Sequence, residues 1–210
     1  GLAPFAARHP DRVMDVGIAE QHALTVAAGM ATAGLHPVVA LYSTFLNRAF
    51  DQLLMDVGLH EQGVTVVLDR AGITGTDGAS HNGMWDLAIC GIVPGLMMAA
   101  PRDRAHLESV LWQAIDIDDR PTVIRYSKDP MPETVEVLRT IDEVDVLKEG
   151  APGGVLMVAH GQLCGTAVEA ATSLGEEVTV VSPRWALPIN PALVSVSYTH
   201  LRAHETSLHL

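Results

Sequence analysis

Apolar runs of strand length alternate along this chain with segments whose apolar residues recur at helical spacing. This pattern predicts strands at 38–42, 64–68, 96–100 and 121–126, and helices at 19–30, 45–57, 85–89 and 104–115. Strands that are apolar throughout and are separated by helices are typical of a parallel sheet flanked by helices. We therefore expect residues 1–127 to form an α/β domain.

The pattern changes after residue 127. Residues 128–150 contain two prolines and many acidic residues with weak periodicity, and we interpret them as a linker between domains. A second α/β domain, truncated, is predicted over residues 151–195. Its predicted elements are a strand at 155–159, a helix at 163–174 and a strand at 178–181.

Both ends of the chain are unusual. Residues 196–210 resemble the translation of a sequencing-library adapter, and we leave them out of the predicted fold. The alternative is a natural amphipathic tail. The chain also begins with Gly1 instead of an initiator methionine, so we expect it to be part of a longer protein.

The composition limits the classes of partner. Hydrophobic residues make up 48% of the 210 residues, which is enough for packed cores, and the formal net charge is -12. Such an acidic chain lacks the basic face that nucleic acids and anionic membranes require. No apolar run approaches the length of a membrane span, and Cys90 and Cys164 lack the spacing of a metal site. We expect a cytoplasmic protein that binds neither nucleic acid nor membrane.

Glu20 is the first candidate for chemistry, because it lies among small and apolar residues at the start of the helix predicted over 19–30. Burial of an unpaired carboxylate is costly, so such a residue usually has a partner or shares a proton with a ligand. The alternative is a carboxylate that only faces the positive end of the helix dipole. The aminopyrimidine ring of thiamine diphosphate is a ligand with this need, because its 1′ nitrogen must hold a proton.

Further candidates follow the ends of predicted strands, where ligands bind in open α/β sheets. Tyr42, Phe45 and Arg48 come where the first strand passes into a helix. Phe45 is suited to stack on a flat ring, and the alternative is core packing. Arg70 and Arg125 also come at or just after strand ends. Three arginines at one crevice of an acidic chain favour a bound phosphate, although an isolated arginine is more often a surface ion pair.

A long polar loop with four glycines occupies residues 69–83, after the second predicted strand. It carries Asp77 and His81. A histidine imidazole can transfer protons near neutral pH, and loops at strand ends carry functional sites disproportionately. We therefore predict that His81 is functional. For His22, which follows Glu20 by two residues, support of the site and plain packing both stay open.

Five segments of the chain occur in the order in which one enzyme family has them: 17–23, 42–48, 69–72, 77–83 and 123–126. They resemble the motifs of thiamine-diphosphate enzymes of the transketolase group, and most of all those of the 1-deoxy-D-xylulose-5-phosphate synthase family. The resemblance covers nearly all of residues 13–126. It implies that residues 1–127 are a transketolase-like pyrimidine-binding domain and that residues 151–195 begin the transketolase C-terminal domain.

The resemblance also implies a reaction and residue roles. Pyruvate would lose carbon dioxide and be joined to glyceraldehyde 3-phosphate by a homodimer that uses thiamine diphosphate and Mg²⁺. Glu20 would activate the cofactor, Phe45 would stack on its pyrimidine ring, and His81 would transfer protons. Arg70 and Arg125 would hold the phosphate of the aldehyde. The implied substrate pocket is lined by Tyr42, Arg48, Arg70, Asp77, His81 and Arg125.

One part of the family pattern is absent. The Gly-Asp-Gly segment that binds Mg²⁺ and diphosphate in this family does not occur in the chain, and no other oxygen ligands have a recognisable spacing. We expect that segment in a missing N-terminal domain, and we expect this chain alone to be inactive. The alternatives are another transketolase-group enzyme, the beta subunit of a 2-oxoacid dehydrogenase and a non-catalytic partner subunit. The arginines and the 77–83 loop favour the synthase over the dehydrogenase.

Overall fold

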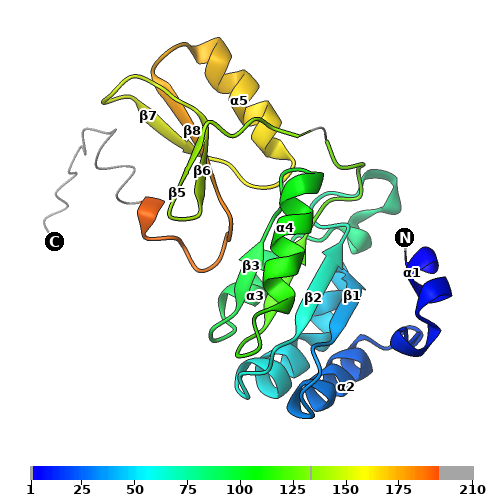
Figure 1. Ribbon diagram of the computed structural model, residues 1–210. Helices are drawn as coiled ribbons and strands as arrows, with labels where there is room; N and C mark the ends of the chain where they lie inside the picture. The colour runs from blue at the N-terminus through cyan, green and yellow to red at the C-terminus, as the bar shows by residue number, and fades with distance from the viewer. Residues whose placement is uncertain (1, 133, 194–210) are drawn as a thin grey trace, which may run out of the picture.

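The computed structural model describes residues 2–132 and 134–193, which form two α/β units that are each built on a four-stranded sheet (Figure 1). The suspected adapter sequence at 196–210 lies outside the described residues. Within the described part of the chain, no helix is both long enough and apolar enough to cross a membrane.

The first sheet is parallel throughout, with the strand order β1-β2-β4-β3. Its strands are β1 (Val38–Tyr42), β2 (Thr65–Asp69), β3 (Met97–Ala99) and β4 (Thr122–Arg125). The α-helices of this unit are α1 (Ala3–Arg8), α2 (Glu20–Thr32), α3 (Asp86–Gly91) and α4 (Arg104–Ile115). Short 3₁₀ turns are η1 (Pro10–Arg12), η4 (Gly75–Asp77) and η5 (Ala79–His81). The predicted fold class, a parallel sheet flanked by helices, is confirmed.

Helices cover both faces of the first sheet. On one face, α2, α3 and the helical segment 43–58 form a core with Val123. The other face is covered by α4 (Figure 1), and Val110 and Ala114 of this helix pack against Ile124. Val123 and Ile124 are neighbours in β4 that point to opposite faces, and both are fully buried. Burial on two faces explains why the central strands β2 and β4 are mostly apolar without alternation, whereas the edge strand β1 is partly exposed.

The helix predicted over 45–57 is present, but it is not a regular α-helix. It begins as a 3₁₀ helix, η2 (Ser43–Ala49), and ends as a π-helix, η3 (Gln52–Gly58). The apolar pattern indicated a helix but could not distinguish turns of three, four or five residues. The difference matters for the site, because residues three apart eclipse one another in a 3₁₀ helix.

The second sheet is mixed and has the strand order β5-β6-β8-β7. Its elements are β5 (Arg139–Ile141), β6 (Val144–Lys148), β7 (Val155–Val158), α5 (Leu163–Leu174) and β8 (Val178–Pro183). β5 and β6 lie inside the segment 128–150 that we predicted to be a linker, so the second half of that segment is folded. The two strands are short, and the turn between them has positive φ at Asp142 and Glu143. Two such short strands explain the weak periodicity of this segment.

A buried group of charged side chains joins the two units. Arg102, just before α4, donates a hydrogen bond from Nη1 to Asp145 of β6 at 2.7 Å. The Nε of Arg102 lies 3.2 Å from Asp103. His106 belongs to the same group, because its Nδ1 accepts a hydrogen bond from the Arg102 backbone at 3.4 Å. The junction therefore depends on charges that are shielded from water.

Acidification is expected to destabilise this junction through His106. Burial, together with Arg102 and Arg184, lowers the pKa of His106 from 6.5 to about 4, although Asp103 and Asp145 act in the opposite direction. Between these two values the unfolded chain binds more protons than the folded chain, so the free energy of unfolding falls as the pH decreases. The expected loss is about 2 kcal/mol at pH 5 relative to pH 7.5.

Urea unfolding of the chain at both pH values measures this loss. The matched variant His106→Asn keeps an acceptor near the Arg102 backbone but does not titrate in this range. It should therefore lose less stability between pH 7.5 and pH 5 than the unchanged chain. An equal loss in both proteins would assign the acid sensitivity to other groups.

Candidate active site

The carboxyl ends of β1, β2 and β4 lie side by side, because these strands are neighbours in a parallel sheet. Tyr42 at the end of β1 is paired with Asp69, the residue before Arg70. Arg125 at the end of β4 is paired with Leu68. Three predicted site residues that are distant in sequence thus leave the sheet at one edge. Open α/β sheets bind their ligands at this edge.

Tyr42, Phe45 and Arg48 form a row where β1 passes into η2, because their spacing of three residues suits a 3₁₀ helix. The rings of Tyr42 and Phe45 are stacked with centroids 6.0 Å apart, and the Arg48 guanidinium lies 4.7 Å from the centre of the Phe45 ring. His81 contacts the same ring edge-on, with centroids 5.5 Å apart. Phe45 is only partly buried, whereas the neighbouring Leu46 lies in the core.

Glu20 is buried but paired. It begins α2 and is 8% exposed. Its two carboxylate oxygens accept hydrogen bonds from Arg48 Nη1 at 3.3 and 3.4 Å. The Arg48 side chain is 48% exposed. Its guanidinium therefore contacts both groups that we predicted to hold the cofactor ring, the Glu20 carboxylate and the Phe45 ring.

Arg70 and Asp77 form a second part of the site. Arg70 donates a hydrogen bond from Nη1 to Asp77 at 3.1 Å, and its guanidinium lies 4.2 Å from the centre of the Tyr42 ring. Asp77 also accepts a hydrogen bond from Lys128 Nζ at 2.8 Å. This bond, with the charges of Lys128, Arg70 and His81, holds the pKa of Asp77 below its ordinary value. Lys128 was not predicted as a site residue, because it lies in the segment that we interpreted as a linker.

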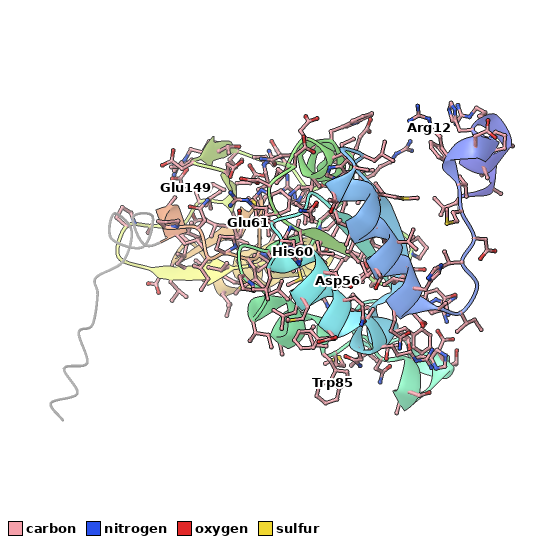
Figure 2. All side chains as sticks on the ribbon, turned by 90° about the horizontal axis from the view of Figure 1, so that it is seen from below. Arg12, Asp56, His60, Glu61, Trp85 and Glu149 are labelled. Carbon is pink, nitrogen blue, oxygen red and sulfur yellow. The ribbon has the colours of Figure 1, made fainter. Side chains whose placement is uncertain are left out.

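Arg125 is paired with Asp86, which was not predicted as a site residue either. Its Nε donates a hydrogen bond to Asp86 Oδ2 at 2.6 Å, and Ser43 Oγ donates to the same oxygen at 2.9 Å. Asp86 begins α3 and is 1% exposed, whereas the adjacent Trp85 is 62% exposed and projects outward (Figure 2). An aspartate at the start of a short helix resembles an ordinary helix terminus in the sequence. Only the strand order brings it to Arg125.

The glycine-rich loop closes on itself and returns to the site. Backbone hydrogen bonds of 2.8 and 2.9 Å join Gly72 and Gly83. At Gly83 a β-carbon would lie 2.5 Å from Ser43 Oγ, so only glycine allows this close return. The closure holds His81 next to the aromatic row. The roles that we assigned to these residues stay predictions.

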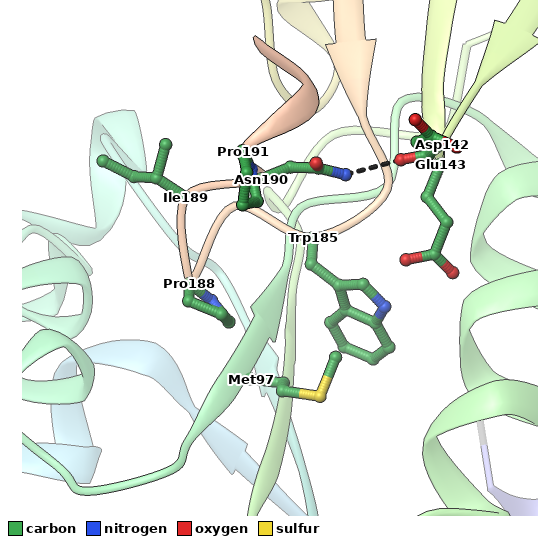
Figure 3. Close-up of a pocket in the computed structure, with 8 residues that line it drawn as sticks. All are labelled: Met97, Asp142, Glu143, Trp185, Pro188, Ile189, Asn190 and Pro191. Atoms are coloured by element: carbon green, nitrogen blue, oxygen red, sulfur yellow. Dashed lines mark hydrogen bonds between the residues drawn. The ribbon is translucent and has the colours of Figure 1, made fainter. Parts of the chain in front are cut away.

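The described residues contain no group of three His, Cys, Asp or Glu side chains that could hold a metal ion. A pocket between the two units contains none of the predicted site residues (Figure 3). It is lined by Met97, Asp142, Glu143, Trp185, Pro188, Ile189, Asn190 and Pro191.

His22, for which support of the site and plain packing were both possible, is exposed on α2, which argues against a packing role.

Comparison with known proteins identifies the class to which this geometry belongs. The family described as the transketolase pyrimidine-binding domain matches residues 1–134, and the chain belongs to this family. The names of similar curated relatives point to one particular enzyme within this class. A protein named 1-deoxy-D-xylulose-5-phosphate synthase from Cutibacterium acnes is 73% identical over 194 residues, and one of the same name from Arthrobacter sp. is 57% identical over 208 residues. The family resemblance found in the sequence is confirmed.

These relatives are much longer than the chain. The two alignments cover 92% and 95% of this chain but only 31% and 32% of the relatives. The chain therefore spans about a third of the length of the curated relatives it matches.

Solved structures show the same architecture. One described as a split gene transketolase, an inactive beta4 tetramer, has a TM-score of 0.79 and 30% identity, and the match covers 93% of this chain and 65% of that one. The transketolase of Campylobacter jejuni has a TM-score of 0.76 at 20% identity, covering 82% of this chain and 28% of that one, which shows the fold alone.

Proposed function

We propose that this chain forms the pyrimidine-binding part of a thiamine-diphosphate enzyme that condenses pyruvate with glyceraldehyde 3-phosphate. The products would be 1-deoxy-D-xylulose 5-phosphate and carbon dioxide. The observation that carries the proposal is one sheet edge that combines a buried carboxylate and an accessible aromatic ring with two arginines. Glu20 and Phe45 suit an aminopyrimidine, while Arg70 and Arg125 suit a phosphate. The names of the curated relatives support the same reaction.

Glu20 and Phe45 fit the cofactor ring by their chemistry. The Glu20 carboxylate is buried, and the side chain of its partner Arg48 is half exposed. In enzymes of this group, thiamine diphosphate supplies the nucleophilic carbon that attacks a keto group. Glu20 would hold the proton on the 1′ nitrogen of the ring, and Phe45 would fix the plane of the ring by stacking.

Arg48 has to change its contacts before the cofactor ring can bind to Glu20 and Phe45. Its guanidinium contacts the Glu20 carboxylate and the Phe45 ring at the same time. We propose that a bound pyrimidine ring takes over these contacts and that the Arg48 side chain turns toward the substrate pocket. The exchange does not leave the buried Glu20 carboxylate unpaired, because the protonated ring nitrogen replaces Arg48, and the half-exposed Arg48 guanidinium regains contact with water.

The remaining predicted residues suit the acceptor aldehyde. Arg70 and Arg125 would bind its phosphate through guanidinium N–H groups, while Tyr42 and Asp77 hold Arg70 in place. His81 would donate a proton to the aldehyde oxygen as the new carbon–carbon bond forms. Mg²⁺ and the diphosphate need further oxygen ligands, and we propose that these lie in the part of the enzyme outside this chain.

The proposal is tested in the full-length enzyme, meaning this sequence within a chain of the length of its curated relatives. Pyruvate and glyceraldehyde 3-phosphate should give deoxyxylulose phosphate. Unphosphorylated glyceraldehyde should be used with a kcat/KM lower by about 100-fold, because it forms no charge-assisted hydrogen bonds with the arginines. Equal use of both aldehydes would contradict the phosphate site.

The alternative functions predict different products. A transketolase would transfer two-carbon units between sugar phosphates without consuming pyruvate. A dehydrogenase subunit would decarboxylate pyruvate but would not require a phosphorylated aldehyde. A non-catalytic subunit would show neither activity. Each of these results would replace the proposed reaction.

A further inference from the structure

Asp86 is a completely buried ionisable side chain at the edge of the candidate site. A buried carboxylate is tolerated only when its oxygens are hydrogen-bonded and a cation is close. Oδ2 of Asp86 accepts from Arg125 Nε at 2.6 Å and from Ser43 Oγ at 2.9 Å, and Oδ1 accepts from the Leu87 backbone at 2.9 Å. These donors come from the end of β4, the start of η2 and the start of α3. The carboxylate therefore connects three elements that surround the site.

The contact between Asp86 and Arg125 uses only part of the guanidinium. A guanidinium has five N–H donors, one on Nε and two on each terminal nitrogen. Arginines that are paired with a carboxylate commonly form two parallel bonds, but here Nε alone donates to Asp86. Within the described residues, the two terminal nitrogens of Arg125 have no protein acceptor. The side chain is 19% exposed, so the four remaining N–H groups are available to an anion.

We infer from this geometry that Asp86 is a positioning residue that orients Arg125 for the phosphate of the acceptor aldehyde. The hydrogen bond that Nε donates to Asp86 fixes the plane of the guanidinium and keeps its terminal nitrogens free. An arginine that is already held in place loses less side-chain freedom when the anion binds. The inference rests on the proposed function, in which Arg125 binds phosphate. Asp86 itself contacts neither substrate nor cofactor and acts through Arg125.

Arg70 is held by other residues, so the support that Asp86 provides is specific to Arg125. Arg70 uses a terminal nitrogen, Nη1, for its bond to Asp77, and it is further supported by the Tyr42 ring. Asp77 is also bonded to Lys128. The two phosphate-binding arginines thus have separate supports, and loss of Asp86 leaves the support of Arg70 in place.

The test is a double-mutant cycle in the full-length enzyme with Asp86→Asn, Arg125→Ala and the double variant. Asparagine keeps the shape of the side chain but removes the charge that holds Arg125. Asp86→Asn should raise the KM for glyceraldehyde 3-phosphate about tenfold, with kcat changed less than about twofold. The KM for unphosphorylated glyceraldehyde should not change. The double variant should be no worse than Arg125→Ala, because the effect passes through Arg125.

Ser43→Ala is the matched control. It removes the other side-chain donor to the same oxygen and leaves the pair with Arg125 intact, so the KM for the phosphorylated acceptor should stay within about twofold. Additive effects of Asp86→Asn and Arg125→Ala would overturn the inference, and so would an equal loss with both aldehydes. If Arg125→Ala leaves the KM for the phosphorylated acceptor unchanged, the proposed phosphate site itself is wrong.

A second measurement needs no variant that could fail to fold. In ¹⁵N NMR spectra of the unchanged protein, the Arg125 Nε–H proton should exchange slowly with water, because it is bonded to a buried carboxylate. Addition of inorganic phosphate should shift the terminal nitrogen signals of Arg125 and leave the Nε signal nearly in place. Rapid exchange of the Nε–H proton before phosphate is added would overturn the inference.

Discussion

Replacement of Glu20 by alanine is expected to lower the kcat of the full-length enzyme by about two orders of magnitude or more. Glu20 lies at the start of α2, nearly buried, and Arg48 links its carboxylate to the Phe45 ring. Alanine leaves no carboxyl group there to hold the proton on the cofactor ring. The measurement is the steady-state rate with pyruvate and glyceraldehyde 3-phosphate at saturating cofactor.

The neighbouring residue Gln21 supplies the control, because it is exposed on the same helix. Gln21→Ala should leave kcat within about twofold, because it keeps the Glu20 carboxylate and replaces only an exposed side chain of α2. Circular dichroism of both variants checks that α2 is intact. Unchanged turnover in the Glu20→Ala enzyme would remove Glu20 from the mechanism.

Replacement of Arg102 by methionine is expected to lower the free energy of unfolding by about 3 to 5 kcal/mol, because it leaves buried carboxylates without their cation. The Arg102 side chain is 8% exposed, and those of its partners Asp103 and Asp145 are 1% and 13% exposed. Methionine keeps most of the length of the side chain, so lost packing contributes less than lost charge. Urea unfolding at neutral pH measures the change.

Arg120 offers a control with the same bond length in a different environment. Its Nη2 is 2.7 Å from Asp119, as Arg102 Nη1 is from Asp145, but both partners are well exposed. Arg120→Met should leave the free energy of unfolding almost unchanged, since exposed ion pairs contribute little. Similar decreases in the free energy of unfolding in the two variants would show that burial does not determine how much the Arg102 ion pairs stabilise the fold.

The elements of the first unit could be predicted from the sequence because the pattern of burial along each segment is local. Strands buried on both faces, such as the one that holds Val123 and Ile124, give uninterrupted apolar runs. The helix that follows β1 was predicted, but its 3₁₀ and π turns were not. Periodicity indicates that one face of a segment is buried, but it does not distinguish helices with different numbers of residues per turn.

The candidate site was only partly predictable. Glu20, Phe45 and His81 occur in short motifs, so the sequence pointed to them directly. Asp86 and Lys128 did not stand out, because an acidic residue at a helix start and a lysine after a strand are common surface features. Their partners lie far along the chain, 39 residues away for Asp86 and 51 for Lys128. Such contacts exist only once the strands have taken their order.

The amino-acid sequence by itself determined the α/β class of the first unit, the family and the side chains that offer chemistry, because periodicity and motifs are properties of neighbouring residues. Only the tertiary structure decided how the charges are paired: Arg48 with Glu20, Arg70 with Asp77 and Arg125 with Asp86. The order β1-β2-β4-β3 places strand ends beside one another that are not consecutive in the chain. Pairing of buried charges follows from this proximity in space, which no local pattern contains.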